Sequence, residues 1–197
     1  MSKRITGYRE ETLKSCTTGA GVAFENFELG TDTYESAMAK KLGATTGGIK
    51  VNVEFPDAWT REIDGLPSNA IGLQENEFVK PTLTGAFVEV SNTSTLKRAL
   101  GSATVAAAES PTGYQVVTPK TDIEAADYLK NITIFTQTKG TNEPLIIQIL
   151  NPLSVDGFEF ATESKAGGSI EVNYVGNFDP LKLEDVPIKF YVPTPAE

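Results

Sequence analysis

Histidine is absent from the 197 residues, and cysteine and tryptophan occur once each. Without an imidazole the chain lacks the side chain whose ordinary pKa lies nearest neutrality, which excludes His-based catalytic triads, Cys–His pairs and imidazole metal sites. The single Cys16 excludes an intramolecular disulfide and a Cys-x-x-Cys site. Because neither a histidine nor a helix start accompanies Cys16, we predict a buried, inert thiol. We therefore expect a protein that is not an enzyme and uses no cofactor or metal.

Long apolar segments are also missing. No stretch approaches the roughly 18 consecutive apolar residues of a membrane-spanning helix. Residues 1–4 are not followed by an apolar signal segment, so we expect folding in the cytoplasm and no membrane partner.

The charge balance is acidic. There are 26 Asp and Glu against 17 Lys and Arg, which gives a formal net charge of −9. This charge opposes generic binding to nucleic-acid phosphates. The remaining composition, 40% hydrophobic and 22% charged, is ordinary for a folded domain.

Motifs of known chemistry are weak. Gly43 and Gly48 have the spacing of a phosphate-binding loop, but Ile49-Lys50 stands where that motif requires Lys followed by Ser or Thr. Asp64-Gly65 and Asp156-Gly157 are typical of turns, because glycine tolerates the backbone conformation that such turns require. Neither pair offers enough oxygen ligands for calcium.

Hydrophobic periodicity indicates the elements near the N-terminus. Residues 1–16 mix charges of both signs without an apolar period, which predicts an arm ordered only by contacts. Residues 21–29 have mixed strand character. A capping box formed by Asp32 and the acidic residue three places later, with Gly43 as the stop, predicts a helix over 33–42.

Residues 49–55 alternate between apolar and polar, which predicts a half-buried strand. A brief return strand is expected over 59–63, with Trp59 packed in a core or against another subunit. Between these elements we predict a hinge and a turn, formed by Gly43, Gly47, Gly48, Asp64 and Gly65.

Residues 66–80 carry Gly, Pro, Asn and Glu without any period, which predicts a long loop. Loops of this length in compact domains usually bind something or pack on a neighbour. We therefore expect a partner surface formed by Leu66, Asn69, Ile71, Leu73 and Phe78.

The middle of the chain contains one clear helix signal. Residues 83–90 predict a strand that is buried on both faces. Asn92 is expected to cap a short helix that closes at Gly101. Residues 102–127 are rich in Ala, Ser, Thr and Pro, which predicts an irregular connection.

The C-terminal part predicts a β-meander, because Gly, Pro and Asn turns separate four strand signals. These signals span 129–136, 145–150, 155–161 and 170–175. A last strand over 186–192 precedes a tail at 193–197. With no linker and no repeat, we predict one β-rich domain over 1–197, carrying one or two short helices.

The order of these features resembles the major tail proteins, or tail tube proteins, of long-tailed bacteriophages. The likeness spans about Gly19 to Val192 and is carried by turn and packing motifs. These are Leu42-Gly43-Ala44-Thr45-Thr46-Gly47-Gly48-Ile49, Ile63-Asp64-Gly65, Gly72, Pro81-Thr82-Leu83 and Thr95-Leu96-Lys97-Arg98-Ala99-Leu100. The resemblance implies a mainly β fold, a sandwich or barrel of two packed antiparallel sheets with one or two short flanking helices.

The resemblance also implies a function. Such proteins form hexameric rings that stack into the hollow tube through which the genome leaves the capsid. It implies assembly in the host cytoplasm, location in the virion tail, and contacts with tape measure, terminator and baseplate or initiator proteins. Contractile-tail tubes, phage-like bacteriocins and type VI secretion tubes share the tube fold, so these machines remain alternatives.

A tube must pass viral DNA without binding it specifically, and lysines or arginines in its bore would hold phosphates. We therefore expect an acidic lining, with contributions from Glu54, Glu62, Glu89 and Glu171. We expect the arm 1–16 and the loop 66–80 to be ordered by the next ring, and a closed ring to protect the sheet edges. The rival hypothesis is a monomeric β-sandwich that binds carbohydrate or acts as an adhesin, although its aromatic residues are scattered.

Overall fold

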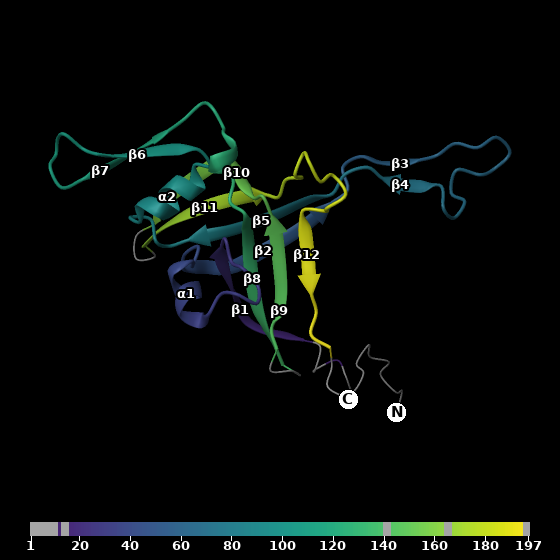
Figure 1. Cartoon of the computed structure of the whole chain (residues 1–197), viewed down its shortest axis with the longest axis horizontal. Helices are drawn as coiled ribbons and strands as arrows, with labels where there is room; N and C mark the ends of the chain where they lie inside the picture. The colour runs from purple at the N-terminus through teal and green to yellow at the C-terminus, as the bar shows by residue number, and fades with distance from the viewer. Residues whose placement is uncertain (1–11, 13–15, 140–142, 164–166, 195–197) are drawn as a thin grey trace.

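The computed structural model describes Thr12 and residues 16–139, 143–163 and 167–194. Two four-stranded antiparallel sheets pack face to face, and two short α-helices lie beside them (Figure 1). The prediction of a mainly β sandwich with short flanking helices is confirmed, and neither sheet closes into a barrel.

The two sheets draw their strands from distant parts of the chain. Sheet A has the spatial order β1 (Thr17–Glu25), β8 (Asn131–Thr138), β9 (Leu145–Leu150) and β12 (Ile188–Tyr191). Sheet B has the order β10 (Leu153–Glu163), β11 (Gly167–Val175), β5 (Lys80–Phe87) and β2 (Thr45–Glu54). In Figure 1 the strands of sheet A run across those of sheet B.

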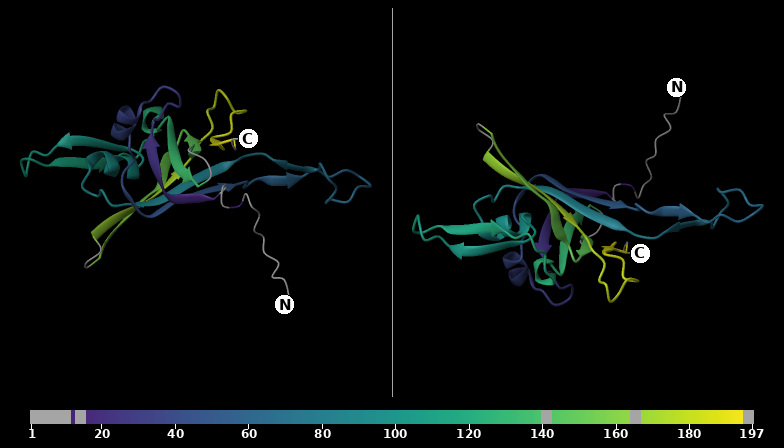
Figure 2. Two further views of the ribbon diagram at one scale, coloured as in Figure 1. Left: turned by 90° about the horizontal axis from the view of Figure 1, so that it is seen from below. Right: turned by 90° about the horizontal axis from the view of Figure 1, so that it is seen from above.

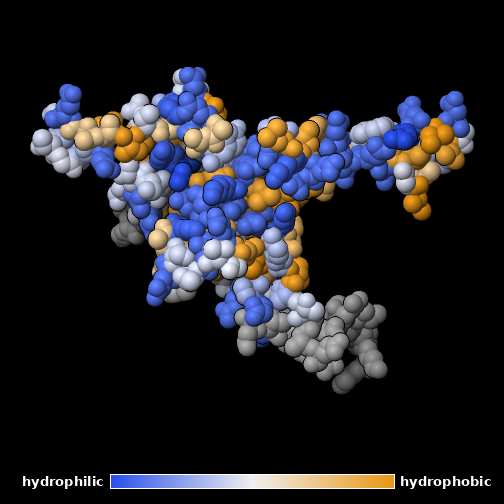
Figure 3. Space-filling model, in the orientation of Figure 1, coloured by the Kyte–Doolittle hydropathy of each residue, from blue (hydrophilic) through white to orange (hydrophobic). Residues whose placement is uncertain are grey.

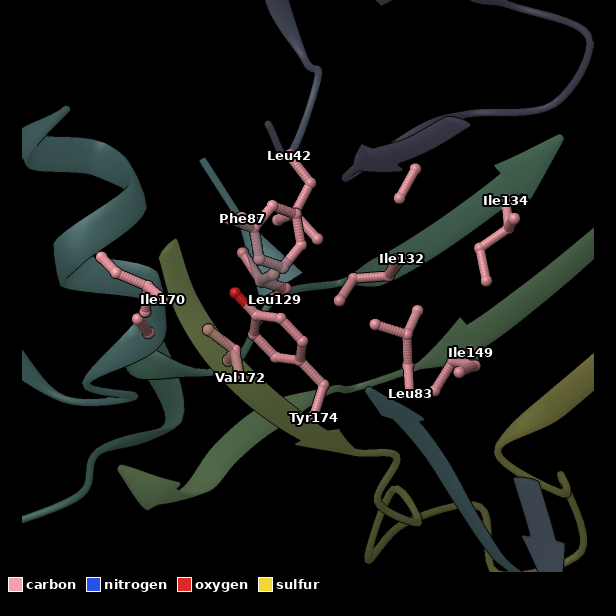
Figure 4. Packing of buried hydrophobic residues seen from close by; sticks show 12 residues of the cluster. Leu42, Leu83, Phe87, Leu129, Ile132, Ile134, Ile149, Ile170, Val172 and Tyr174 are labelled. Carbon is pink, nitrogen blue, oxygen red and sulfur yellow. The ribbon is translucent and has the colours of Figure 1, made fainter. Parts of the chain in front are cut away.

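The core lies between the sheets, where apolar side chains of both inner faces meet (Figure 4). Sheet A contributes Ile132, Ile134 and Ile149, and sheet B contributes Leu83, Phe87, Ile170, Val172 and Tyr174. The strand register explains which residues of sheet B enter the core. Ile170 pairs with Phe87 and Tyr174 with Leu83, so these side chains share one face.

The predicted meander is wrong. β8 pairs with β9 and β10 pairs with β11, but the chain passes from sheet A to sheet B between β9 and β10. Asn151, at a positive φ of 47°, and Pro152 make this short connection. The turn was recognisable from its residues, whereas the sheet that the next strand joins depends on long-range packing.

The glycine-rich segment is part of a strand. β2 already begins at Thr45, and Gly47 and Gly48, at φ 75° and 86°, form a bulge where the register with β5 shifts between Thr46 and Ile49. The predicted hinge at these two glycines is therefore a bulge in an edge strand. Gly43 precedes the strand and packs against Phe87.

The first helix is shorter than predicted. α1 spans Tyr34–Ala39, and its capping box is formed by Thr33 and Ser36. Asp32 instead accepts a hydrogen bond from the Glu28 amide and forms an ion pair with Lys40 at 2.8 Å. The Glu28 amide and Lys40 both lower the pKa of Asp32. The Asp32 carboxylate therefore holds the loop before the helix.

The second helix follows the prediction. α2 spans Thr93–Ala99, and the Asn92 side chain accepts from the Ser94 amide at its N-terminus. Gly101 follows its end at a φ of 73° and lies against the backbone of Ser154. Ala99 is fully buried, so the helix covers sheet B beside β10 and β11.

Two segments predicted to be irregular contain hairpins. β3 (Ala58–Thr60) pairs with β4 (Gln74–Asn76), and β6 (Ala103–Ala107) pairs with β7 (Gln115–Pro119). The predictions of a structureless loop over 66–80 and an irregular connection over 102–127 are therefore wrong in part. A short 3₁₀ helix, η1 (Ala125–Asp127), completes the second segment.

Two smaller predictions are wrong, and the predicted terminal segments lie largely outside the described residues. β5 is buried on one face only, because Leu83 and Phe87 are buried whereas Thr84 on the opposite face is exposed. Val88, which was also predicted to be buried, lies just beyond the strand and is exposed. Cys16 is exposed, and its thiol donates to the Thr12 carbonyl at 3.0 Å. Of the predicted arm 1–16 and tail 193–197, residues 1–11, 13–15 and 195–197 lie outside the described residues.

Candidate functional site

The outer face of sheet B is polar. Side chains alternate between the faces of a strand, so the register places Thr46, Ala86, Glu171 and Glu159 in one row across the sheet. The next row on this face contains Lys50, Thr84 and Asn173. We call this surface the polar face.

A shallow hollow of about 550 Å³ lies on the polar face, between the bulges of the two edge strands. The small residues Gly85 and Ala86 line it in the middle. At the β10 bulge, Nδ2 of Asn173 donates to Asp156 at 2.6 Å. Lys50, Glu159 and Glu171 also line the hollow, which makes it suited to exclude an anion rather than to enclose an apolar ligand.

Two of the four predicted acidic residues lie on this face but far apart, because Glu54 is opposite Lys80 and Glu171 is opposite Ala86, which is about 20 Å farther along β5. Glu54 accepts from Asn52 at 2.8 Å at the end of β2, and Glu171 lies on β11. Glu159, directly opposite Glu171 in the register, was missed. Its position between Phe158 and Phe160 in the predicted strand over 155–161 was the available signal.

The other two acidic residues are exposed but lie elsewhere. Glu62 follows β3 and lies outside sheet B. Glu89 follows β5 and accepts from the Ala44 amide at 3.2 Å. Alternation in the sequence predicts which residues within a strand share a face. It does not predict where side chains beyond the strand ends lie, as for Glu62 and Glu89.

A long projection comprises residues 55–79 and continues β2 and β5 away from the sandwich (Figures 1 and 2). We call this projection the arm; it is distinct from the predicted N-terminal arm 1–16. Figure 3 shows apolar side chains at its end. Of the predicted partner residues, Leu66, Asn69 and Ile71 are exposed, and Ile71 is fully so. Leu73 is buried, contrary to a role in partner binding, and Phe78 packs edge-on against Phe178.

The arm is stiffened where β3 and β4 pair. Arg61 forms an ion pair with Glu75 at 2.7 Å, and its guanidinium lies 5.9 Å from the Trp59 ring centre. Trp59 is half-exposed, so it does not belong to the core of this chain. Asp64 and Gly65 form a turn as predicted, with Gly65 at a φ of 83°.

A second projection, which we call the ribbon, comprises residues 103–119 and contains β6 and β7. Thr93 of α2 bonds Gln115 at 2.8 Å. At its base, Asp127 accepts from Lys120 and Ser102, each at 3.0 Å. The Glu124 amide, followed by Lys120, lowers the pKa of Asp127 to about 2.

Within the described parts of the chain, no group of three or more Asp, Glu or Cys residues lies close enough together to hold a metal ion. None of the helices in these parts is long and apolar enough to cross a membrane. A scan against protein-family models and a search of curated proteins find no match for this chain.

Proposed function

We propose that this chain is the subunit of a hollow tube, built from stacked hexameric rings, through which a phage genome leaves its capsid. The observation that carries the proposal is the construction of sheet B. One face of this sheet is apolar and buried, and the other is polar. Among the described residues neither edge strand pairs with a further strand, so both can pair with another copy.

Strand direction supports closure into a ring. The four strands of sheet B alternate in direction, so β10 and β2 at its two edges are antiparallel to one another. The β2 of one copy placed beside the β10 of the next therefore continues an antiparallel ladder. Such a contact joins two different surfaces, and contacts of this kind close into a ring when the rotation between neighbouring copies adds up to a full turn. Ring closure also removes the exposed edges that would otherwise aggregate.

The polar face suits the bore of such a tube. Glu54, Glu159 and Glu171 repel the phosphates of passing DNA, whereas lysines and arginines would bind them and release counterions. Among the described residues, Lys50 is the one cation that lines the hollow, against the carboxylates of Asp156, Glu159 and Glu171. Farther along the polar face, Lys80 lies opposite Glu54. Outside the bore, the arm projects from the sandwich along the strands of sheet B, in the direction of an adjacent ring (Figure 1).

This proposal places the protein in the virion tail after assembly in the host cytoplasm. It implies contacts with the tape measure, terminator and baseplate or initiator proteins. A bacteriocin or secretion tube would use the same geometry. A carbohydrate-binding monomer is less well supported, because the exposed Trp59 and Tyr114 lie on separate projections rather than on one platform.

The oligomeric state of the purified full-length chain tests the proposal. We expect rings or hollow tubes in negative-stain electron microscopy, and a mass well above that of one chain in size-exclusion light scattering. A stable monomer at high protein concentration, with affinity for a sugar, would overturn it.

A further inference from the structure

The arm and the ribbon extend from opposite ends of the long axis of the molecule. Figure 1 shows this arrangement, and both turned views in Figure 2 agree with it. The arm continues the strands of sheet B, whereas rings close across those strands. In a stack of identically oriented rings, the arm of one copy therefore points toward the end of the next ring that carries the ribbon.

We propose that the ribbon is the surface on which the arm of a second copy docks. This inference rests on the proposed tube and adds the partner surface for the arm. It joins two different surfaces of identical chains, so each copy offers one of each. Contacts of this type repeat without closing and build an open stack.

The charges of the two projections fit this pairing. The arm contains five acidic residues, Asp57, Glu62, Asp64, Glu75 and Glu77, and one basic residue, Arg61, so its net charge is 1 − 5 = −4. The ribbon has a single charged residue, Glu109. On a chain of net charge −9, the ribbon is therefore a surface that an acidic arm can approach with little like-charge repulsion.

The apolar surfaces also correspond. Val116 and Tyr114 of the ribbon are 47% and 66% exposed, and Ile71 and Leu66 at the end of the arm are at least as exposed as Val116. Burying such side chains against one another removes apolar surface from water. Figure 3 shows apolar residues on both projections.

The backbone of the ribbon gives a third reason. β6 and β7 pair only with each other among the described residues, so each has an outer edge available for pairing. A two-stranded hairpin is marginally stable in water on its own, and α2 packs along the ribbon, where Thr93 bonds Gln115 at the end of β7 next to the connecting loop. A docked arm would cover the ribbon surface that α2 leaves exposed, including Tyr114 and Val116.

Site-specific photocrosslinking tests the contact in assembled full-length protein. Val116 is replaced by p-benzoylphenylalanine, and isotopically heavy and light copies are mixed so that crosslinks between copies are recognised by mass. We expect heavy–light crosslinks from position 116 to peptides within residues 55–79. Crosslinks between copies that join other segments, in tubes that form normally, would overturn this inference and leave the tube proposal intact.

A pair of matched variants provides a second test. We expect Val116→Glu to raise the protein concentration needed for tube growth about tenfold or more, with rings retained. Val116→Lys should do less harm, because the arm is acidic. Met38→Glu on α1, where the side chain is 40% exposed outside both projections, is the control and should leave growth unchanged. Equal growth of Val116→Glu and the control would overturn the inference, whereas absence of rings in the unmodified protein would overturn the proposed function itself.

Discussion

Arg98 of α2 donates from Nε to the Glu25 carboxylate of β1 at 2.7 Å, across a separation of 73 residues in the chain. This ion pair ties the helix that covers sheet B to the edge strand of sheet A. Tyr174 is buried near it, and burial together with the Glu25 charge raises the pKa of Tyr174. The phenol therefore stays neutral, and Arg98 remains the partner of Glu25.

Arg98→Ala should lower the free energy of unfolding by about 1.5–3 kcal/mol, because it leaves a partly buried carboxylate without its charged donor. Urea unfolding followed by circular dichroism measures the change. Arg61→Ala is the control, since the Arg61–Glu75 pair has the same 2.7 Å separation but its arginine is 57% exposed rather than 29%. The control should lose less than about 1 kcal/mol. Equal losses would show that burial does not govern the Arg98 contact.

Gly101→Ala should destabilise the fold more than Gly65→Ala. Both glycines have positive φ, so each alanine incurs backbone strain of about 1 kcal/mol or more. Only at Gly101 would the new Cβ also meet the carbonyl oxygen of Ser154, whereas nothing lies near it at Gly65. Overpacking of this kind adds about 1–3 kcal/mol. Equal urea midpoints for the two variants would contradict the close approach of α2 to β10.

Asp127→Asn should lower the melting temperature at pH 7, and the difference from the unmodified protein should shrink as the pH falls from about 4 toward 2. The pKa of Asp127 is about 2 in the folded chain against an ordinary 3.8. The unfolded carboxyl therefore binds its proton at higher pH, and stability rises with pH across this window. Melting curves at stepped pH values measure the effect. A difference that stays constant down to pH 2 would contradict the role of this carboxylate at the base of the ribbon.

Replacement of Glu159 and Glu171 by lysine should make assembled tubes retain DNA, with binding that weakens as salt rises. The double variant places cations on the polar face, which is the proposed bore. The control is Glu35→Lys with Glu184→Lys, which makes the same charge change at exposed positions outside the polar face and both projections. Filter binding of tubes to double-stranded DNA measures retention. Similar retention by both variants would argue that the polar face is not the bore.

Replacement of residues 61–73 by an Asn-Gly turn should prevent stacking and leave rings intact. Thr60 and Gln74 are paired in β3 and β4, so a two-residue turn can close the shortened hairpin. Negative-stain microscopy counts rings and tubes, and circular dichroism checks the fold. The matched point variants are Ile71→Lys, expected to act like the deletion, and Ser68→Lys, expected to be neutral. If the shortened chain forms normal tubes, the arm does not make the stacking contact.

Local chemistry made several elements predictable. β9 has the predicted bounds, because its apolar run lies between turn residues on both sides. The Asn92 cap was predictable because capping depends on neighbours within one helical turn. Of the arm hairpin, the return strand predicted over 59–63 overlaps β3 in part, whereas β4 and the ribbon hairpin were missed because exposed two-stranded ribbons leave no apolar period in the sequence. One of the three carboxylates of the polar face was missed for a related reason, since Glu159 becomes notable only beside Glu171.

By itself, the sequence determined what is local: the lack of imidazole chemistry, the acidic charge, most strand positions and the turns between them. The tertiary structure alone decided which sheet each strand joined. β9 and β10 are neighbours in the chain but lie in different sheets, and three carboxylates from β2, β10 and β11 share one face. The physical reason is that pairing between distant strands depends on how whole apolar faces pack together. A short segment of sequence contains only one of the two surfaces that pack.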